Sequence, residues 1–343
     1  MTVFVRHTMM SLNFPARCGM DRAPHRRLWV LCLACAATLA CAAVSFAGGI
    51  RPQDDIVLVN VRNVGGCCDP GVLAEGAQFE AYVNCESGGR RWQQASLESL
   101  TSADPSVSTV VFIHGNRLTN WDAKCEGLAA YRRIASQAGE APIRFVIFSW
   151  PSAQISGPLK DVRVKAVRTR PAGCQLAWLV DQLPAETPVT LVGFSYGARI
   201  ATGALHILGG GSLGGMTVSL QHPDRPPMNA VLLASALNSD WLCPGHYHGH
   251  AMSMVDQMVL VNNCEDMAMK YYHFSTTCGR PQALGYCGPT CIDPAGASKI
   301  VELNVARYVG REHDLFCYLS APGVISEIAE LSNVPVGHAV AMR

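Results

Sequence analysis

Three apolar segments constrain the fold of this chain more than any other feature. They are TVVFIHGN (109–116), IRFVIFSWPS (143–152) and PVTLVGF (188–194), and none shows the in–out alternation of a half-exposed strand. Segments with helical periodicity, at 122–138 and 160–183, separate them. Strands buried on both faces and alternating with helices are typical of a mostly parallel sheet covered by helices on both sides. We therefore predict an α/β fold.

The remaining chain extends the same pattern. Hydrophobic residues make up 49% of the sequence and charged residues 15%, which is enough apolar material for a large core. No internal repeat or linker stands out, so residues 48–343 are predicted to form one domain. Further strands are expected at 228–236, 257–263 and 300–305, and further helices at 196–208 and 321–332.

Two early segments differ from the buried strands. Residues 56–61 and 79–83 lie closer together and are more polar, as expected of an antiparallel edge. A turn-rich loop, VGGCCDPG, connects them. Later in the chain, Pro171 is expected to interrupt the helix at 160–183, since proline lacks a backbone N–H.

The first 47 residues have the features of an export leader. A basic region with Arg22, Arg26 and Arg27 precedes the apolar run 28–47, which ends in Ser45-Phe46-Ala47. A small-x-small ending is what a signal peptidase requires, so residues 1–47 are predicted to be a cleaved signal peptide and the protein to be periplasmic or extracellular. An uncleaved membrane anchor and a lipoprotein modified at Cys41 are the alternatives.

Cysteine usage agrees with export. Eleven cysteines follow Ala47, so several disulfides are expected with one cysteine left over. Cys278, Cys287 and Cys291 lie in a Gly/Pro-rich stretch that a disulfide could staple. Zinc is the alternative there, although the CxxC pairs of a zinc site are absent. The eleven are Cys67, Cys68, Cys85, Cys125, Cys174, Cys243, Cys264, Cys278, Cys287, Cys291 and Cys317.

The segment LVGFSYGAR (191–199) places a serine between two glycines, where a buried strand ends and a helix begins. A G-x-S-x-G in this context forms a strained turn that lifts the serine hydroxyl above the sheet. The turn also directs the N–H of the next residue at the reaction site. We predict Ser195 as a nucleophile and the Tyr196 N–H as one oxyanion donor, against the alternative of a structural turn serine.

A second motif, FIHGN, ends an earlier buried strand. In a hydrolase of this layout, the loop after such a strand donates the other backbone N–H of the oxyanion hole. Asn116 is predicted to be that donor, and Gly115 lets the backbone turn tightly. His114 is interpreted as a residue that fixes the loop by hydrogen bonding. An ordinary strand-ending turn is the alternative.

The motifs VFIHGN, FSWPS and GFSYG together resemble the α/β-hydrolase superfamily over roughly residues 55–335. The likeness is greatest to a bacterial branch of uncharacterised serine hydrolases with an HGN or HGY loop and a strand ending in SWPS. The resemblance implies an α/β-hydrolase fold and a nucleophile followed by an acid and then a histidine. It implies hydrolysis of a carboxylic ester, with amide or thioester as alternatives, and requires no cofactor or metal.

The expected order locates the other two catalytic groups. A carboxylate after the strand at 257–263 is predicted to be the acid: Asp266 first, Glu265 next, and Asp240 after the preceding strand as a third candidate. The competing interpretation of Asp266 is a helix N-cap. His313 in VGREHDLFCYL is predicted to be the base. His338, six residues from the end of the chain, is its rival.

Other clusters point elsewhere. His246, His248 and His250 could bind copper or zinc with Met252 and Met254, but a polar loop at the active-site rim is the preferred interpretation. In KDVRVKAVRTR, charges at Asp161, Arg163 and Lys165 alternate with valine and suggest a solvated helix face, or else a basic rim for an anionic substrate.

The overall charge excludes one class of partner. The net charge is +1, and no basic cluster outside the leader is long enough to follow nucleic-acid phosphates. The loops at 151–160, 209–227 and 268–300 are expected to shape the substrate pocket. The sequence therefore predicts an exported serine hydrolase acting on a small ester, with contact to a membrane only through its leader or a lipid anchor. A non-catalytic binding protein on the same fold is the alternative.

Overall fold

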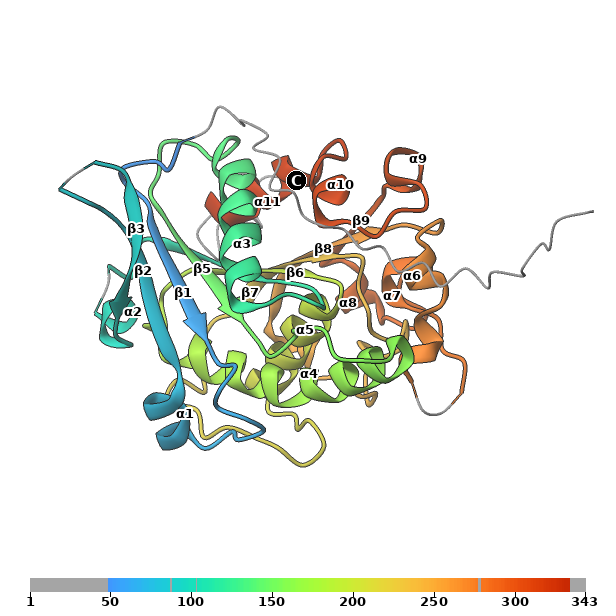
Figure 1. Cartoon of the computed structure of the whole chain (residues 1–343). Helices are drawn as coiled ribbons and strands as arrows, with labels where there is room; N and C mark the ends of the chain where they lie inside the picture. Colours follow the sequence, from blue (N-terminus) through green and yellow to red (C-terminus); the bar gives the residue numbers. More distant parts are fainter. Residues whose placement is uncertain (1–48, 87, 103, 277–278, 334–343) are drawn as a thin grey trace, which may run out of the picture. The chain divides into compact units, whose positions relative to one another are not determined.

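The computed structural model describes residues 49–86, 88–102, 104–276 and 279–333, which lie in one compact unit. Within them, nine strands form one sheet in the order β3-β2-β1-β5-β4-β6-β7-β8-β9 (Figure 1). The strands are β1 Asp55–Asn60, β2 Gln78–Asn84, β3 Arg90–Ala95, β4 Ser108–Ile113, β5 Ile143–Ser149, β6 Val189–Phe194, β7 Met228–Leu233, β8 Val255–Asn262 and β9 Ile300–Asn304.

The helices are of two kinds. Long helices cover the sheet, and short helices stand in the connecting loops, most of them after β7. They are α1 Pro70–Gly76, α2 Glu98–Thr101, α3 Asn120–Ala135, α4 Pro158–Asp181, α5 Tyr196–Leu208, η1 Ala251–Met254, α6 Met267–Lys270, η2 Tyr272–Ser275, α7 Leu284–Cys287, α8 Pro294–Ala297, α9 Ala306–Val309, α10 Leu315–Leu319 and α11 Val324–Asn333.

The seven strands β1, β5, β4, β6, β7, β8 and β9, in their order across the sheet, are parallel to one another. The central strands are fully buried. β5 lies on one side of β4 and β6 on the other, so the chain reverses its direction of travel across the sheet at β4. Ligands of open α/β sheets bind at the carboxyl ends of the strands at such a switch point. The HGN loop after β4 and the serine turn after β6 meet at this place.

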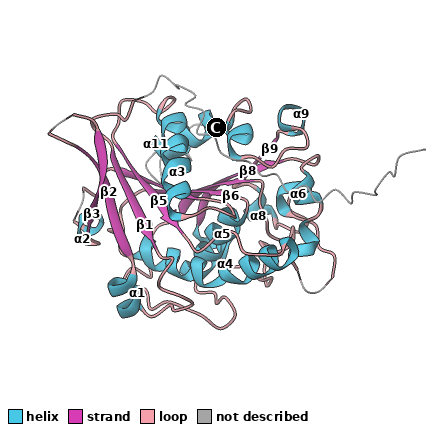
Figure 2. Cartoon of the chain, viewed as in Figure 1, coloured by secondary structure: helices cyan, strands magenta, loops and turns pink. Residues whose placement is uncertain are grey.

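Helices cover both faces of the sheet, as Figure 2 shows. The crossovers β4-α3-β5 and β5-α4-β6 run in opposite directions across the sheet, so their right-handedness places α3 and α4 on opposite faces. α11 packs on α3, and α5 packs on α4. This is the layout of the α/β-hydrolase fold, and the predicted fold class is confirmed.

The edge of the sheet differs from expectation. β1 is an internal strand, parallel to β5, and its residues after Asp55 are buried. β1 and β2 do pair antiparallel, as predicted, but β2 continues into an antiparallel pair with β3, which forms the outer edge. β3, RRWQQA, was absent from the predicted strands because its polar residues give no apolar run, and its half-exposed place at the edge requires none.

The helix α4 is continuous across Pro171, so the predicted interruption is wrong. A proline inside a helix removes the hydrogen bond to the carbonyl four residues earlier, here that of Val167. The Val167 side chain is 56% exposed. Water can therefore reach this side of the helix and satisfy the carbonyl.

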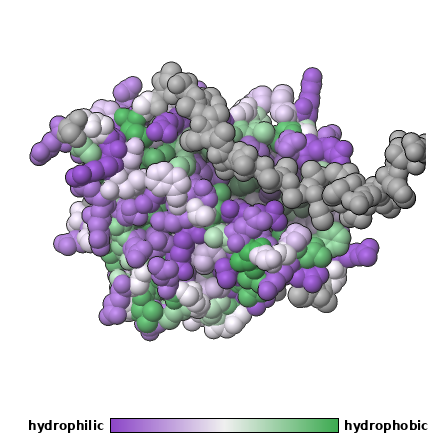
Figure 3. Space-filling view, viewed as in Figure 1, coloured by the Kyte–Doolittle hydropathy of each residue, from purple (hydrophilic) through white to green (hydrophobic). Residues whose placement is uncertain are grey.

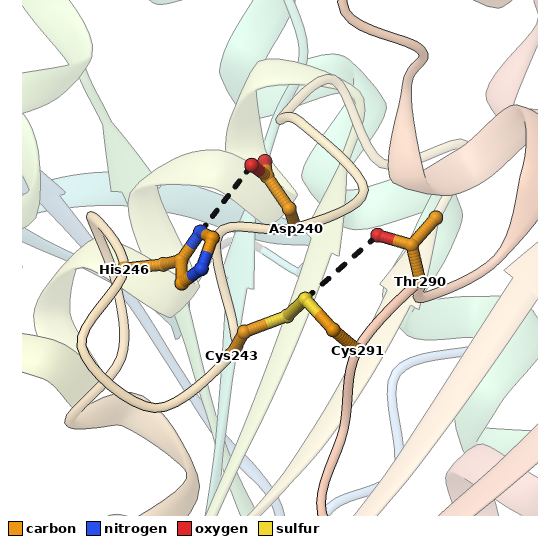
Figure 4. The surroundings of a disulfide bond; sticks show 5 residues. All are labelled: Asp240, Cys243, His246, Thr290 and Cys291. Atoms are coloured by element: carbon orange, nitrogen blue, oxygen red, sulfur yellow. Dashed lines mark hydrogen bonds and ion pairs between the residues drawn. A yellow bond between two sulfur atoms is a disulfide. The ribbon is translucent and has the colours of Figure 1, made fainter.

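One disulfide joins two described residues, Cys243 and Cys291, with Cα atoms 5.5 Å apart (Figure 4). It ties the predicted Gly/Pro-rich stretch to the loop after β7 and is not an internal staple of that stretch. Cys67, Cys68 and Cys174 keep free thiols, so the expectation of several disulfides is reduced to one between described residues. Cys278 lies outside the described residues.

The surface of the molecule and its leader relate to the predictions about export and membrane contact. The face in Figure 3 is largely hydrophilic, with apolar side chains in small patches. Among the described residues, none of the helices combines the length and apolar character that spanning a bilayer requires. The leader predicted over 1–47, with its Cys41, lies outside the described residues, and the boundary of the domain at 48 stays a prediction.

Candidate active site

Ser195 sits on a sharp turn between β6 and α5. Its φ of 56° and ψ of −116° are unusual for a residue with a Cβ, so the turn is strained. The flanking glycines explain how the backbone fits: a Cβ on Gly197 would lie 2.0 Å from the Ile113 oxygen, and one on Gly193 would lie 2.6 Å from the Ala198 Cα. The G-x-S-x-G spacing is therefore a packing requirement of this turn.

His313 lies within hydrogen-bonding distance of Ser195. The His313 Nε2 is 3.0 Å from the Ser195 Oγ, although 118 residues separate them in the sequence. The His313 Nδ1 is 2.7 Å from the Asp266 Oδ2. When Nδ1–H donates to this carboxylate, Nε2 is left with a lone pair that accepts the serine proton. The Phe194 ring stacks on the imidazole at 5.0 Å between centroids and restricts its rotation.

Asp266 divides its two carboxylate oxygens between two tasks. Oδ1 accepts from the N–H groups of Ala268 and Met269 and so caps α6. Oδ2 accepts from His313 and from the Tyr318 hydroxyl, which is 2.7 Å away. Burial works to raise the pKa of Asp266, but these hydrogen bonds and the His313 charge outweigh it and hold the pKa below its usual range. The helix-cap and acid interpretations of this residue are thus compatible.

The structure separates the rival acids from the histidine. Glu265 is exposed, and the contact made by its backbone is to the Asn263 side chain. Asp240 lies near the disulfide, where its carboxylate is 3.3 Å from His246 (Figure 4). His338 lies outside the described residues. Among the predicted candidates that the structure describes, Ser195, His313 and Asp266 are the ones brought together.

The two predicted oxyanion donors flank Ser195 in the same cavity. Within the described residues, neither the Asn116 N–H nor the Tyr196 N–H donates a hydrogen bond to a protein oxygen. Gly115 allows the loop to approach, because a Cβ there would lie 2.9 Å from the Phe194 ring. Both N–H groups are therefore available to an oxygen bound beside the serine.

His114 has a structural position. It is buried, its ring stacks on Trp150, and its Nδ1 lies 2.8 Å from the Gly115 oxygen. Burial, together with the positive charge of Arg62, lowers the pKa of His114 to about 3, so the imidazole is neutral at physiological pH. These contacts agree with the prediction that it fixes the HGN loop.

A buried ionic network holds this loop from the other side. The Asp161 Oδ2 accepts from the Asn116 side-chain amide at 3.0 Å and from the Arg117 Nε at 3.1 Å. The Asp161 Oδ1 accepts from the Ile155 N–H at 3.0 Å and from the Lys165 ammonium at 2.9 Å. Burial opposes the ionised form, yet the donors led by Lys165 keep the pKa of Asp161 below its usual range.

The predicted solvated face of α4 is therefore wrong for two of its three charges. Asp161 and Lys165 are fully buried, whereas Arg163 is exposed. Residues four apart on a helix share a face, and residues two apart point in nearly opposite directions. The alternation that looks like one polar face in sequence is divided by the helix between the interior and the solvent.

A cavity of about 480 Å³ opens beside Ser195 and His313. Its walls come from the HGN loop, α3, the start of α4, the serine turn, the α6–η2 segment and the start of α10. The predicted loops 151–160 and 268–300 contribute to it, and 209–227 does not. It is lined by Asn116, Arg117, Glu126, Pro158, Leu159, Val162, Phe194, Ser195, Tyr196, Ala236, Ala268, Met269, Tyr271, Tyr272, Phe274, Ser275, His313, Asp314 and Leu315.

Glu126 is the lining residue that sequence reasoning missed. Burial, together with the negative charges of Asp314 and Asp122, raises the pKa of Glu126 to about 8. In the sequence it is one more charged residue on a helix, with no motif around it. Its position in the cavity depends on packing between α3 and elements far along the chain, which no local pattern reports.

The histidine-rich loop does not line this cavity, so its predicted place at the rim is wrong. His248 is buried against α5, where its Nδ1 lies 2.9 Å from the Thr202 Oγ1, and its ring stacks on Tyr247. Within the part of the chain that the structure describes, no three His, Cys, Asp or Glu side chains are grouped closely enough to hold a metal ion.

Comparison with known proteins completes the description. No protein-family model and no curated protein matches the chain. Similar solved structures include acyl-protein thioesterase 2 from Zea mays, with 15% identity over 66% of this chain and 92% of that one and a TM-score of 0.35. An acetylxylan esterase is 14% identical over 66% and 95%, with a TM-score of 0.30.

A third similar structure is an IroE-like serine hydrolase from Shewanella oneidensis. It is 14% identical, covers 76% of this chain and 77% of that one, and has a TM-score of 0.33. These scores are too low to carry an argument about function. The α/β-hydrolase fold of this chain rests on its own strand order, its helix layers and the turn after β6.

Proposed function

We propose that this protein is a serine hydrolase that acts on carboxylic esters. The observation that supports it most directly is the hydrogen-bonded series from Ser195 through His313 to Asp266, with distances of 3.0 Å and 2.7 Å. A serine hydroxyl becomes a useful nucleophile when a neighbouring imidazole accepts its proton and a carboxylate stabilises the resulting cation. These two distances support the assignment of the three roles.

The proposed reaction proceeds in two halves. The Ser195 Oγ attacks the ester carbonyl carbon while His313 Nε2 takes the hydroxyl proton, and the carbonyl oxygen becomes an oxyanion. The C–O bond to the alcohol then breaks, and His313 returns the proton to the leaving alkoxide. A water molecule next gives a proton to His313 and attacks the acyl carbon. The bond from that carbon to Ser195 Oγ then breaks, and His313 returns the proton to Oγ, which releases the carboxylic acid and restores the enzyme.

The surrounding groups support the charge that forms in each half. The N–H groups of Asn116 and Tyr196, which donate to no oxygen of the described residues, would donate to the oxyanion. Asp266, kept ionised by its hydrogen bonds, would stabilise the imidazolium. Asp161 would hold the Asn116 loop through the amide contact at 3.0 Å and the Arg117 contact at 3.1 Å. Nothing in this scheme draws on a metal or an organic cofactor.

Covalent labelling tests the proposal. A fluorophosphonate probe should modify the wild-type protein at Ser195, and Ser195→Ala should remain unlabelled. Hydrolysis of p-nitrophenyl esters of rising chain length should fall by about 10³-fold or more in Ser195→Ala and in His313→Ala. A folded wild-type protein that takes no label and hydrolyses none of these esters would instead support a non-catalytic binding protein on the same fold.

We propose further that the protein is exported. The Cys243–Cys291 disulfide is compatible with an oxidising compartment, and the basic-apolar leader ends in Ser45-Phe46-Ala47. Mass spectrometry of the mature protein from its native host should find Gly48 at the N-terminus. A mature chain that keeps the leader, or that begins with a lipidated Cys41, would replace the cleaved form by one of the anchored forms.

A further inference from the structure

Glu126 has an unusual position for a carboxyl group. It projects from α3 into the wall of the cavity that contains Ser195 and His313. Its Oε1 is shielded from solvent and accepts no hydrogen bond. Among the residues that the structure describes, no side chain donates a hydrogen bond or forms an ion pair with this carboxyl. Buried polar groups are nearly always paired, so the missing partner points to a ligand.

The charges around Glu126 are of its own sign. Asp122 lies one turn earlier on α3, and Asp314 lines the same cavity next to His313 in the sequence. Both are held by other tasks: Asp122 completes the capping box of α3 with Thr119, and Asp314 caps α10. Neither can turn away without uncapping a helix. Arg117, the cation on the cavity wall, is already paired with Asp161.

Aromatic rings line another part of the same cavity. Tyr271, Tyr272 and Phe274 come from the α6–η2 segment, and the side chains of Tyr271 and Phe274 remain about half exposed. The faces of aromatic rings attract cations, and such rings are typical of sites for quaternary ammonium groups. An unpaired carboxyl and accessible rings in one cavity are complementary to the same kind of ligand.

From these contacts we propose that the substrate of this site carries a cationic nitrogen, an ammonium or quaternary ammonium group, which pairs with Glu126. The inference rests on the proposed esterase function and adds a substrate class to it. A neutral hydrogen-bonding group would satisfy Glu126 but would leave the repulsion that Asp122 and Asp314 exert on its charge in place. A cation offsets all three carboxylates, which is why the charged ligand is favoured.

Protection of Ser195 from a fluorophosphonate probe tests this without assuming which side of the scissile bond bears the charge. Choline and 3,3-dimethylbutanol have nearly the same shape, but only choline is charged. In the wild-type protein at pH 8.5, choline should protect at a concentration about tenfold lower than the alcohol. In Glu126→Gln this ratio should fall to near one, and in the control Glu265→Gln, an exposed glutamate outside the cavity, it should stay at the wild-type value.

The outcomes are distinct. If the wild-type protein takes no label at all, the proposed esterase function fails before the substrate class is in question. If labelling proceeds and the two compounds protect equally, the cationic substrate is overturned. If the preference for choline persists in Glu126→Gln, then Glu126 is not its binding partner and that assignment is overturned. Labelling of the Glu126→Gln protein itself shows that its site has folded.

Discussion

Two carboxyl groups lie at the candidate site in opposite surroundings, one with hydrogen-bond donors and one without any among the described residues. Asp266, behind His313, accepts four hydrogen bonds, two from backbone N–H groups and two from side chains. Glu126, on the cavity wall, accepts none from the described residues. The pKa of Asp266 lies below its usual range, and that of Glu126 rises to about 8. Asp266 is buried, and Glu126 is half-buried with its Oε1 shielded from water, so burial alone does not determine the charge.

The difference shows that hydrogen-bond donors decide whether a shielded carboxyl group is ionised. Desolvation acts on both groups in the same direction, toward the protonated acid. Asp266 overcomes it because its donors favour the ionised form, and Asp161, with Lys165 and Arg117, does the same. For Glu126, the charges of Asp314 and Asp122 add to desolvation and favour the protonated acid. The protein itself supplies the partners of Asp266 and Asp161, whereas the proposed partner of Glu126 is a bound ligand.

The largest effect should come from removing the charge of Asp266. Asp266→Asn keeps the shape of the side chain but favours the wrong imidazole tautomer, so kcat for a p-nitrophenyl ester should fall by about 10³- to 10⁴-fold. Steady-state kinetics measures this. Glu265→Gln and Asp240→Asn are matched controls and should retain activity. If one of them loses activity while Asp266→Asn does not, the assignment of the acid is wrong.

The next largest effect tests whether Asp161, like Asp266, is a carboxylate that its donors keep ionised. Asp161→Asn leaves the Lys165 ammonium, which is fully buried, without its carboxylate. We expect a loss of about 3–5 kcal/mol in the free energy of unfolding, measured by urea denaturation. kcat should fall more than KM rises, because the Asn116 loop loses its anchor.

A double variant provides the control for Asp161. Asp161→Asn combined with Lys165→Met removes both charges, and it should recover much of the lost stability because no unpaired charge remains buried. Recovery of stability without recovery of kcat would identify Asp161 as a positioning residue of the loop. Equal recovery of both would reduce its role to stability.

A smaller effect concerns Glu126 and the pH dependence of the free energy of unfolding. Its folded pKa, about 8, exceeds the unfolded value, so the native state binds the proton more tightly. The contribution of Glu126 to stability is therefore present at low pH and is lost as pH rises from about 4.3 to about 8. Glu126→Gln should match the wild type near pH 4.5 and exceed its stability by on the order of 2 kcal/mol above pH 8. Equal urea profiles at both pH values would contradict the uncompensated charge.

The smallest effect concerns Tyr318, one of the four donors to Asp266. Tyr318→Phe removes its hydroxyl and should reduce the free energy of unfolding at pH 7 by about 1 kcal/mol. The stabilisation from Asp266 is present above its unfolded pKa and is lost as pH falls through its folded pKa. With one donor fewer the folded pKa rises, so acid unfolding should begin at a higher pH. Circular dichroism against pH measures both, and an unchanged acid transition would remove Tyr318 from the network.

Local patterns were sufficient to predict the fold and the serine turn of the candidate site. The apolar runs of β4, β5 and β6 predict a buried parallel sheet, because a strand covered on both faces needs apolar residues at every position. The Gly193 and Gly197 spacing predicts the serine turn, because a Cβ at either place would overlap the backbone. The prediction of Asp266 and His313 came from the chain order that the resemblance to the α/β-hydrolase superfamily implies.

What the sequence by itself determined is therefore local: the sheet, the turn after β6 and the chain order of the three groups. The tertiary structure alone decided which partners each charge meets. It buried Lys165 beside Asp161, left Glu126 without a donor among the described residues, and paired Cys291 with Cys243. The physical reason is that periodicity and steric limits act between near neighbours in the chain. Charge and hydrogen bonding depend on groups that only folding brings together.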